Sequence, residues 1–242
     1  MKPYLSVIVP LYNEEPRVSK IDHVVDYLST LMFESELILV DDGSTDKTEN
    51  IIRKYQSRGV KIITYKPNMG KGYAIRSGML MAQGDYRIFL DVDLSTPIEE
   101  LENFIPYLKK FDCIIGTRKA HGAKVSLHQT WLRENLGKGF TFLSQLILST
   151  PISDFTCGFK CFSANCAESV FSIAKIDRWG FDSEALFLCK KLHFSVKEVP
   201  VRWTNDARSR VKFPDDILRS LSDLATIRYN DLKGVYTTKT NK

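Results

Sequence analysis

Short apolar runs alternate with helical patterns along the first half of the chain. The runs are rich in valine, isoleucine and leucine and end at polar segments, which is typical of strands buried in a parallel sheet. Pro97 stands where a helix is expected to begin. The runs predict strands over residues 5–10, 36–40, 61–65, 86–90 and 113–116, with helices over 17–31, up to 55, up to 81 and from 97 onward.

The second half is less regular. Its pattern predicts helices over 133–149, 181–191 and 214–229 and a strand over 196–200, whereas residues 233–242 read as a polar tail. Strands that alternate with helices at this spacing predict an α/β fold, with a mostly parallel sheet and helices on both faces. Because no repeat, linker or low-complexity tract interrupts the pattern, we expect a single domain over residues 1–232.

Composition narrows the class of protein. The 242 residues are 43% hydrophobic, enough for a large core, and no run approaches the roughly 18 to 20 apolar residues of a membrane span. The first strand begins almost at the N-terminus, so we expect no secretory signal. Five cysteines without a C-x-x-C pair predict free thiols in a reducing cytoplasm. The net charge of +5 leaves nucleic acid, an anionic membrane and a phosphate-bearing substrate open.

Acidic or polar side chains follow three of the predicted strands, where ligands of open parallel sheets bind. They are Asn13-Glu14, Asp41-Asp42, and the pair Asp91 and Asp93. Residues that flank one position of an extended chain point to the same side, and two neighbouring carboxylates repel unless a cation lies between them. Asp91 and Asp93 therefore predict a divalent metal, Mg²⁺ or Mn²⁺, that also binds substrate phosphates.

Other nucleotide-binding and hydrolytic motifs are missing from the sequence. Neither G-x-x-x-x-G-K-[ST] nor G-x-G-x-x-G occurs, and Gly70-Lys71-Gly72 is too short to replace them. The four histidines lie in unrelated contexts. These absences argue against P-loop, dinucleotide-binding and serine-hydrolase chemistry.

Four motifs in order resemble the nucleotide-sugar half of family 2 glycosyltransferases, which have the GT-A fold. They are Val9-Pro-Leu-Tyr-Asn-Glu14, Val40-Asp-Asp-Gly-Ser-Thr-Asp46, Asn68-Met-Gly-Lys-Gly72 and Asp91-Val-Asp93. The resemblance implies that residues 1–116 bind a nucleotide sugar and 117–232 the acceptor. It assigns the nucleotide to Pro10, Tyr12, Glu14, Asp42, Lys71 and Asp91, and the metal to Asp91 and Asp93.

The second half resembles the polyprenyl-phosphate sugar synthases, and most of all the dolichyl-phosphate glucosyltransferases, followed by the mannose synthases. The resemblance rests on Asp154-Phe-Thr-Cys-Gly-Phe-Lys160, Arg178-Trp-Gly-Phe-Asp-Ser-Glu184, Trp203-Thr204 and Ser209-Arg-Val211. This chain differs from those relatives in two expected respects. We expect no hydrophobic anchor such as some of them have, and Arg208 and Arg210 stand where relatives have a small residue and lysine. The resemblance assigns the sugar and acceptor to Asp154, Lys160, Phe181, Asp182, Glu184 and Ser209, with a place in the core alone as the alternative for Phe181.

The implied reaction moves a hexose, with inversion, from a nucleoside-diphosphate sugar to a polyprenyl or dolichyl phosphate, with UDP-glucose favoured over GDP-mannose. A phosphate monoester is largely ionised at neutral pH, so the acceptor needs positive charge more than it needs a base. We therefore expect Asp154 to act as a positioning or electrostatic residue, and count Asp93, Arg118 and Arg210 with it as catalytic. Cations for the acceptor phosphate or the diphosphate would come from Arg118, Arg133, Arg208 and Arg210. Each of these arginines could equally be an ordinary surface residue.

The basic excess fits this reaction. Residues 109–140 hold seven Lys/Arg and two Asp/Glu, which would attract an anionic membrane surface. We thus expect a cytoplasmic enzyme, peripheral on the cytoplasmic face of a membrane, and no nucleic-acid partner, because the basic residues form no aromatic-interleaved or helix-turn-helix pattern.

Two other functions remain compatible with the sequence. A family 2 enzyme could use a hydroxyl acceptor on a glycan, protein or lipid, which would require a general base. Alternatively, the chain could be a catalytically silent nucleotide-sugar-binding protein, although the intact Asp91, Asp93 and Asp154 motifs argue against it.

Overall fold

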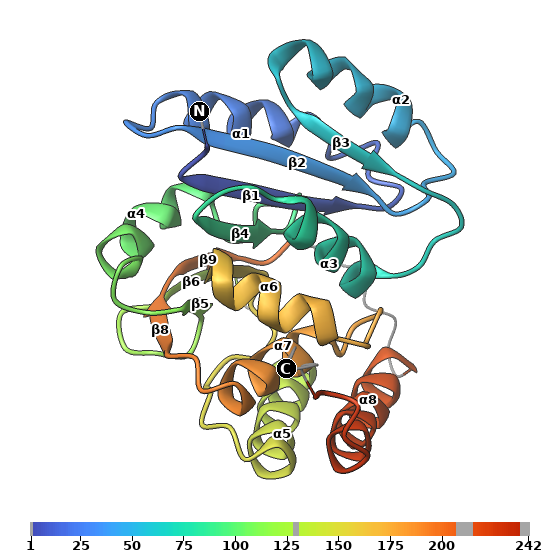
Figure 1. Cartoon of the computed structure of the whole chain (residues 1–242), viewed down its shortest axis with the longest axis vertical. Helices are drawn as coiled ribbons and strands as arrows, with labels where there is room; N and C mark the ends of the chain where they lie inside the picture. Colours follow the sequence, from blue (N-terminus) through green and yellow to red (C-terminus); the bar gives the residue numbers. More distant parts are fainter. Residues whose placement is uncertain (1, 128–130, 207–214, 238–242) are drawn as a thin grey trace, which may run out of the picture.

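The computed structural model describes residues 2–127, 131–206 and 215–237, with the backbone alone at 127, 131–134 and 215–218. A seven-stranded sheet with the order β3-β2-β1-β4-β7-β5-β8 forms its centre (Figure 1). All neighbouring strands are parallel except β7, which is antiparallel to both β4 and β5. The strands are β1 (Leu5–Leu11), β2 (Ser35–Asp41), β3 (Lys61–Thr64), β4 (Tyr86–Leu90), β5 (Cys113–Thr117), β6 (Lys124–Leu127), β7 (Phe159–Ser163), β8 (Val196–Pro200) and β9 (Arg202–Thr204).

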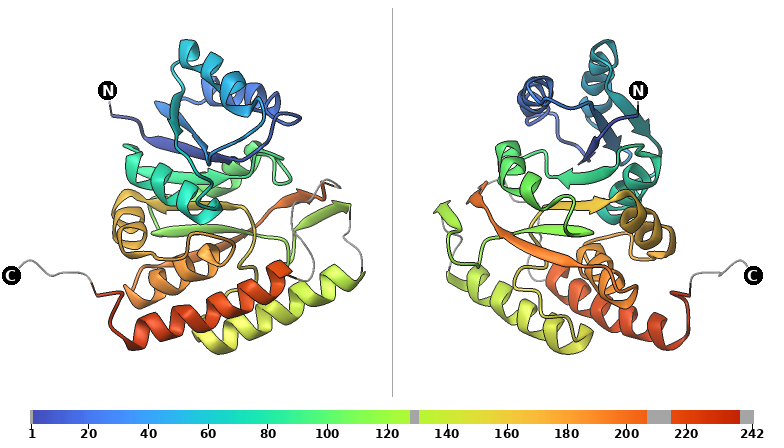
Figure 2. Two further views of the ribbon diagram at one scale, coloured as in Figure 1. Left: turned by 90° about the vertical axis from the view of Figure 1, so that its right-hand side faces the viewer. Right: turned by 60° about the vertical axis from the view of Figure 1, so that its left-hand side comes forward.

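Helices cover both faces of this sheet, as the alternating pattern predicts (Figure 1). Helix α3 packs across β1 and β2, while α5 and α8 pack against each other in the second half (Figure 2). The helices are α1 (Lys20–Ser29), α2 (Thr48–Ile52), α3 (Lys71–Met81), α4 (Leu101–Phe104), α5 (Trp131–Leu148), α6 (Ala164–Ile173), α7 (Phe181–Lys191) and α8 (Asp215–Leu232), with 3₁₀ turns η1 (Arg53–Arg58), η2 (Ile98–Glu100) and η3 (Ile105–Tyr107).

Alternate strand residues divide between two hydrophobic cores. Ile8 and Val40 pack on the α3 side, whereas Val7 and Leu39 pack on the α1 side. This follows from the two-residue period of a strand, and burial on both faces explains why the runs are apolar throughout. The cores fix the strand ends, and thereby the loops that carry the candidate site.

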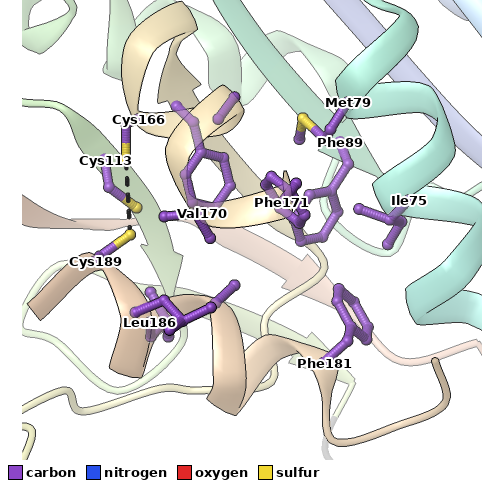
Figure 3. Packing of buried hydrophobic residues seen from close by; sticks show 14 of the residues in the cluster. Ile75, Met79, Phe89, Cys113, Cys166, Val170, Phe171, Phe181, Leu186 and Cys189 are labelled. Atoms are coloured by element: carbon purple, nitrogen blue, oxygen red, sulfur yellow. Dashed lines mark hydrogen bonds between the residues drawn. The ribbon is translucent and has the colours of Figure 1, made fainter. Parts of the chain in front are cut away.

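The cysteines confirm the expectation of free thiols. All five are buried, and none of them forms a disulfide. Cys166 Sγ lies 3.7 Å from Cys189 Sγ in the α3-side core (Figure 3). Cys113 lies beside them and belongs to the same cluster (Figure 3). These residues behave as small apolar side chains.

Several features differ from the predicted elements. Strands β6, β7 and β9 and helix α6 were not predicted, and Ser163 caps α6 by accepting a hydrogen bond from Cys166 N. The helix expected from Pro97 is broken into short turns, because Pro106 has no amide hydrogen to donate. Tyr236, placed in the predicted polar tail, is only 1% exposed and packs against Phe187.

Among the described residues, no helix is both long and apolar enough to cross a membrane.

Candidate active site

The predicted nucleotide residues come together at the carboxyl edge of the sheet. Tyr12 to Glu14 follow β1, Asp42 follows β2, Asp91 follows β4 and Arg118 follows β5. These strands run in the same direction, so their ends share one edge. This edge is the candidate active site.

The loop after β1 is fastened to the loop after β2. Asn13 adopts a φ of 52°, which asparagine tolerates better than most residues. Its Oδ1 accepts hydrogen bonds from Thr45 N at 2.7 Å and Asp46 N at 3.2 Å, and its own amide donates to Ser44 Oγ at 2.8 Å. The two motifs, about thirty residues apart in the sequence, therefore form one rigid wall.

Pro10, Tyr12 and Glu14 lie differently on this wall. Pro10 is half-buried in β1 and Tyr12 is 37% exposed. Glu14 is 7% exposed, and its carboxylate forms an ion pair with Arg17, whose Nη1 lies 2.9 Å from Glu14 Oε2. Tyr12 is thus the most accessible of the three for contact with a ligand.

Asp42 organises the loop that leads into α3. It is 2% exposed, and its carboxylate accepts hydrogen bonds from Asn68 Nδ2 at 2.6 Å, Met69 N at 2.8 Å and Gly70 N at 2.9 Å. These bonds hold the turn that brings Lys71 to the start of α3. In this structure Asp42 binds the loop, and a nucleotide contact would have to share its oxygens.

Lys71 lies against the first aspartate of the D-x-D motif. Its Nζ is 2.6 Å from Asp91 Oδ1 and 5.8 Å from the ring centres of Trp179 and Phe181. Burial opposes the charge on Lys71, but Asp91 and Asp182 outweigh this effect and raise the lysine pKa. Lys71 is therefore a fixed cation beside the place expected for a diphosphate.

Asp91 and Asp93 fit a small divalent cation. A Cβ on Gly158 would lie 2.1 Å from Asp91 Oδ2, so only glycine leaves room for that carboxylate. Asp93 Oδ1 accepts a 2.9 Å hydrogen bond from Ser95 N. No group of three or more His, Cys, Asp or Glu side chains forms a metal cage among the described residues. One or two carboxylates completed by substrate phosphates is the arrangement that Mg²⁺ commonly uses.

A buried ion pair lies behind Asp91. Lys160, on β7, is fully buried, and its Nζ donates to the Asp182 carboxylate and, at 2.6 Å, to Cys157 O. Burial raises the pKa of Asp182, against the opposing effect of Lys160 and Lys71. Removing either partner would leave a buried charge uncompensated, which is strongly destabilising.

Arg118 and Asp154 form a second pair on the acceptor side. Two 2.7 Å hydrogen bonds join Arg118 Nε to Asp154 Oδ2 and Arg118 Nη2 to Asp154 Oδ1, and the Arg118 amide adds a third at 3.0 Å. Burial alone would raise the pKa of Asp154, but the charge and hydrogen bonds of Arg118 outweigh it and lower the pKa to about 2. Asp154 is thus a permanent anion and a very weak base.

Like Lys160 and Asp182, the predicted sugar-pocket residues Phe181 and Glu184 lie in the interior. Phe181 is 4% exposed and packs on Phe89 in the core. Glu184 is completely buried, and its oxygens accept hydrogen bonds from Lys175 N, Ile176 N and Tyr236 Oη. The structure thus places Glu184 among structural partners and not on an open wall, because its carboxylate ties the start of α7 to the C-terminal segment.

Some predicted residues lie outside the described part of the chain. Arg208, Ser209 and Arg210 fall in 207–214, and the side chain of Arg133 is not described. Conversely, the structure adds Arg17, Gly158 and Trp203, which contact Glu14, Asp91 and Arg118 respectively. Gly158 and Trp203 lie inside motifs of the second half, whereas no pattern around Arg17 distinguishes it.

Comparisons with known proteins agree with this geometry. The model of the family described as Glycosyl transferase family 2 matches residues 6–171. The Dolichyl-phosphate beta-glucosyltransferase of Dictyostelium discoideum is 32% identical, over 98% of this chain and 77% of that protein. The mouse protein of the same name is 35% identical, over 97% of this chain and 78% of its own length.

Solved structures share the fold. Glucosyl-3-phosphoglycerate synthase from Mycobacterium tuberculosis, in complex with Mn²⁺, UDP and glucosyl-3-phosphoglycerate, has a TM-score of 0.65 at 17% identity. The match covers 98% of this chain and 82% of that one. Staphylococcus aureus TarS 1-349, in complex with UDP-GlcNAc, has a TM-score of 0.59 at 20% identity, over 95% of this chain and 67% of that one.

The sequence prediction of a GT-A fold is therefore confirmed, and the family match extends from the β1 motif through β7 and α6. The predicted enzyme class is confirmed as well. The protein is a hexosyltransferase that belongs to glycosyl transferase family 2.

Proposed function

We propose that the protein transfers glucose, with inversion, from a nucleoside-diphosphate glucose to dolichyl phosphate or a related polyprenyl phosphate. UDP-glucose is the favoured donor. The names of the relatives support the sugar and the acceptor class. The Mn²⁺ and UDP in the complex of the mycobacterial synthase support a metal and a uridine donor. Residues 1–116 would bind the donor and 117–232 the acceptor.

The paired hydrogen bonds between Arg118 and Asp154 give the strongest support for this function. A hydroxyl acceptor must lose a proton and needs a base, whereas a phosphate monoester is already largely ionised at neutral pH. With its pKa lowered to about 2, Asp154 is a poor base and a good anchor for a cation. The pair therefore favours an anionic acceptor, held by Arg118, over a hydroxyl.

On the donor side, the residues have separate roles. Asp91 and Asp93 would hold the divalent cation, which neutralises charge on the diphosphate when bound. Lys71 adds a positive charge beside Asp91 and would stabilise the leaving diphosphate. The buried ion pair of Lys160 and Asp182 would support this site from the protein interior.

The acceptor phosphate would arrive from a membrane, where its polyprenyl chain stays. Lys109, Lys110, Lys119 and Lys124 belong to the basic stretch over 109–140 and favour contact with anionic lipid headgroups. We propose that the enzyme works as a peripheral protein on the cytoplasmic face of a membrane.

A donor panel tests the proposal. UDP- and GDP-linked glucose and mannose are each incubated with a short polyprenyl phosphate and Mg²⁺ or Mn²⁺, and the product is identified by mass. We expect glucosyl polyprenyl phosphate from UDP-glucose. Transfer only to acceptors that lack a phosphate would refute the proposal and support a hydroxyl acceptor.

A further inference from the structure

A short segment after β8 contacts both halves of the candidate site. It comprises Arg202 to Asp206, which we call the β9 segment, and β9 pairs with β6 apart from the main sheet (Figure 2). None of its described side chains lies in the nucleotide or metal motifs. Its contacts nevertheless reach the donor loop, the segment after the D-x-D motif and Arg118.

Arg17 makes the contact with the donor loop. Its side chain is 7% exposed, and its Nη1 lies 2.9 Å from Glu14 Oε2 while its Nε lies 3.2 Å from Asp206 Oδ2. One guanidinium thus joins two carboxylates that are nearly two hundred residues apart in the sequence. The planar guanidinium presents its donors in a fixed fork that matches both carboxylates, whereas a lysine ammonium on its flexible stem would not keep this geometry.

The segment that follows the D-x-D motif is fixed to the same strand. Thr204 N donates a 2.8 Å hydrogen bond to Ser95 O, and Ser95 N in turn donates to Asp93 Oδ1 at 2.9 Å. Arg202 forms an ion pair with Glu100, whose side chain is 1% exposed. The main chain of β9 is thereby tied to the residues next to Asp93.

The far side of the β9 segment reaches the acceptor pair. The guanidinium carbon of Arg118 lies 5.3 Å from the ring centre of Trp203, within the range of a cation–π contact. Asp154 holds one edge of the Arg118 guanidinium, and the carbon of this guanidinium lies over the ring of Trp203. The orientation of Arg118 therefore depends on where β9 lies.

We propose that the β9 segment is a positioning strut that sets Arg118 relative to the donor site, and that Arg17 is the positioning residue that anchors it. This inference rests on the proposed function, because it assigns Arg118 to the acceptor phosphate. Neither Arg17 nor Asp206 touches the reacting atoms. A buried ion pair is in itself weak evidence for stability, and here its effect is to hold two substrate sites at a fixed separation.

The test compares Arg17→Lys, Asp206→Asn and the double variant with the wild type. Transfer to a short polyprenyl phosphate and hydrolysis of the donor by water are measured separately, at equal folded fraction by circular dichroism. Glu168→Gln is the matched control, since Glu168 pairs with another buried arginine, Arg87, away from the β9 segment. Asp206→Asn removes the negative charge that pairs with Arg17 and keeps the size of the side chain.

We expect each single variant to lower kcat/KM for the polyprenyl phosphate about tenfold, because small displacements of a positioned group have large effects on rate. In Asp206→Asn, which leaves the Arg17–Glu14 pair in place, the KM for the donor and the rate of donor hydrolysis should stay within about twofold of the wild type. The double variant should be no worse than the more impaired single variant, since both changes break one link.

Unchanged transfer in Asp206→Asn would overturn the inference. So would a parallel fall in transfer and donor hydrolysis, which indicates a merely structural role, or multiplied effects in the double variant. A wild-type enzyme that hydrolyses the donor but transfers no sugar to polyprenyl phosphate would refute the proposed function, and this inference with it.

Discussion

Arg118 and Asp154 are joined edge to edge, with the Nε and Nη2 of one residue each 2.7 Å from a carboxylate oxygen of the other. The Asp154 side chain is 1% exposed, whereas the Arg118 side chain retains 21% of its exposure. The carboxylate therefore lies behind the arginine and fixes its orientation. Arg118 is thus the member of the pair that faces solvent.

If Asp154 acts by holding Arg118, the two residues form one functional unit. We expect Arg118→Gln and Asp154→Asn each to lower transfer by about tenfold to a hundredfold, and the double variant to match the worse single variant. Steady-state kinetics with varied acceptor measure this. An inactive Asp154→Asn beside a nearly active Arg118→Gln would instead indicate a general base and a hydroxyl acceptor.

The lowered pKa of Asp154 predicts a dependence of stability on acid. Because the pKa falls from an ordinary 3.8 to about 2 on folding, the stabilisation is complete above pH 4 and is lost as the pH falls from about 4 to about 2. It amounts to roughly 2 kcal/mol. Urea unfolding across this range should show a steeper loss for the wild type than for Asp154→Asn.

Asp85→Asn is the control for that measurement. Asp85 forms an exposed pair with Lys2, which should contribute little. Equal acid sensitivity in the wild type and Asp154→Asn would contradict the assignment of the titrating group.

The D-x-D carboxylates predict metal-dependent binding of the donor nucleotide. We expect Asp91→Asn and Asp93→Asn to weaken UDP binding in the presence of Mn²⁺ at least about tenfold, because each removes a charged oxygen ligand. Calorimetric titration of UDP with and without Mn²⁺ measures the effect, and Asp231→Asn, on α8, is the control. UDP binding that is independent of Mn²⁺ in the wild type would contradict the prediction.

We expect the contact between Glu184 and Tyr236 to contribute to stability and not to catalysis. Tyr236→Phe removes the donor that lies 2.6 Å from Glu184 Oε1 and leaves a buried carboxylate oxygen short of a partner. We expect the free energy of unfolding to fall by about 1–3 kcal/mol with kcat unchanged. Tyr229→Phe, at a 60% exposed position, should change neither. A lower kcat at full stability would place Glu184 in the sugar pocket.

The elements that the sequence predicts well are those whose signal is local. Continuous apolar runs predict β1, β2 and β4 because these strands are buried on both faces. Strand β7 was not predicted, because Lys160 interrupts its apolar pattern and the compensating Asp182 lies on another element. Tyr236 was missed for the same reason, since its partners lie about fifty residues earlier.

The candidate site likewise contains residues that the sequence predicts and contacts that it does not. The Asp91 and Asp93 pair is visible from spacing alone, and resemblance singles out Asp154. Sequence could not predict that Arg118 would lock Asp154, because their contact depends on how β5 and the loop before β7 are placed in space. Arg17 had no signal at all, since its second partner, Asp206, is brought to it only by the path of β9.

We propose that the acceptor is a lipid phosphate held by Arg118. The most direct measurement compares glucose transfer from UDP-glucose to a short polyprenyl phosphate and to the same polyprenol without its phosphate, under identical Mn²⁺ and detergent. We predict product from the phosphate alone, with the rate reduced in Arg118→Gln. Equal or faster transfer to the alcohol would contradict the account.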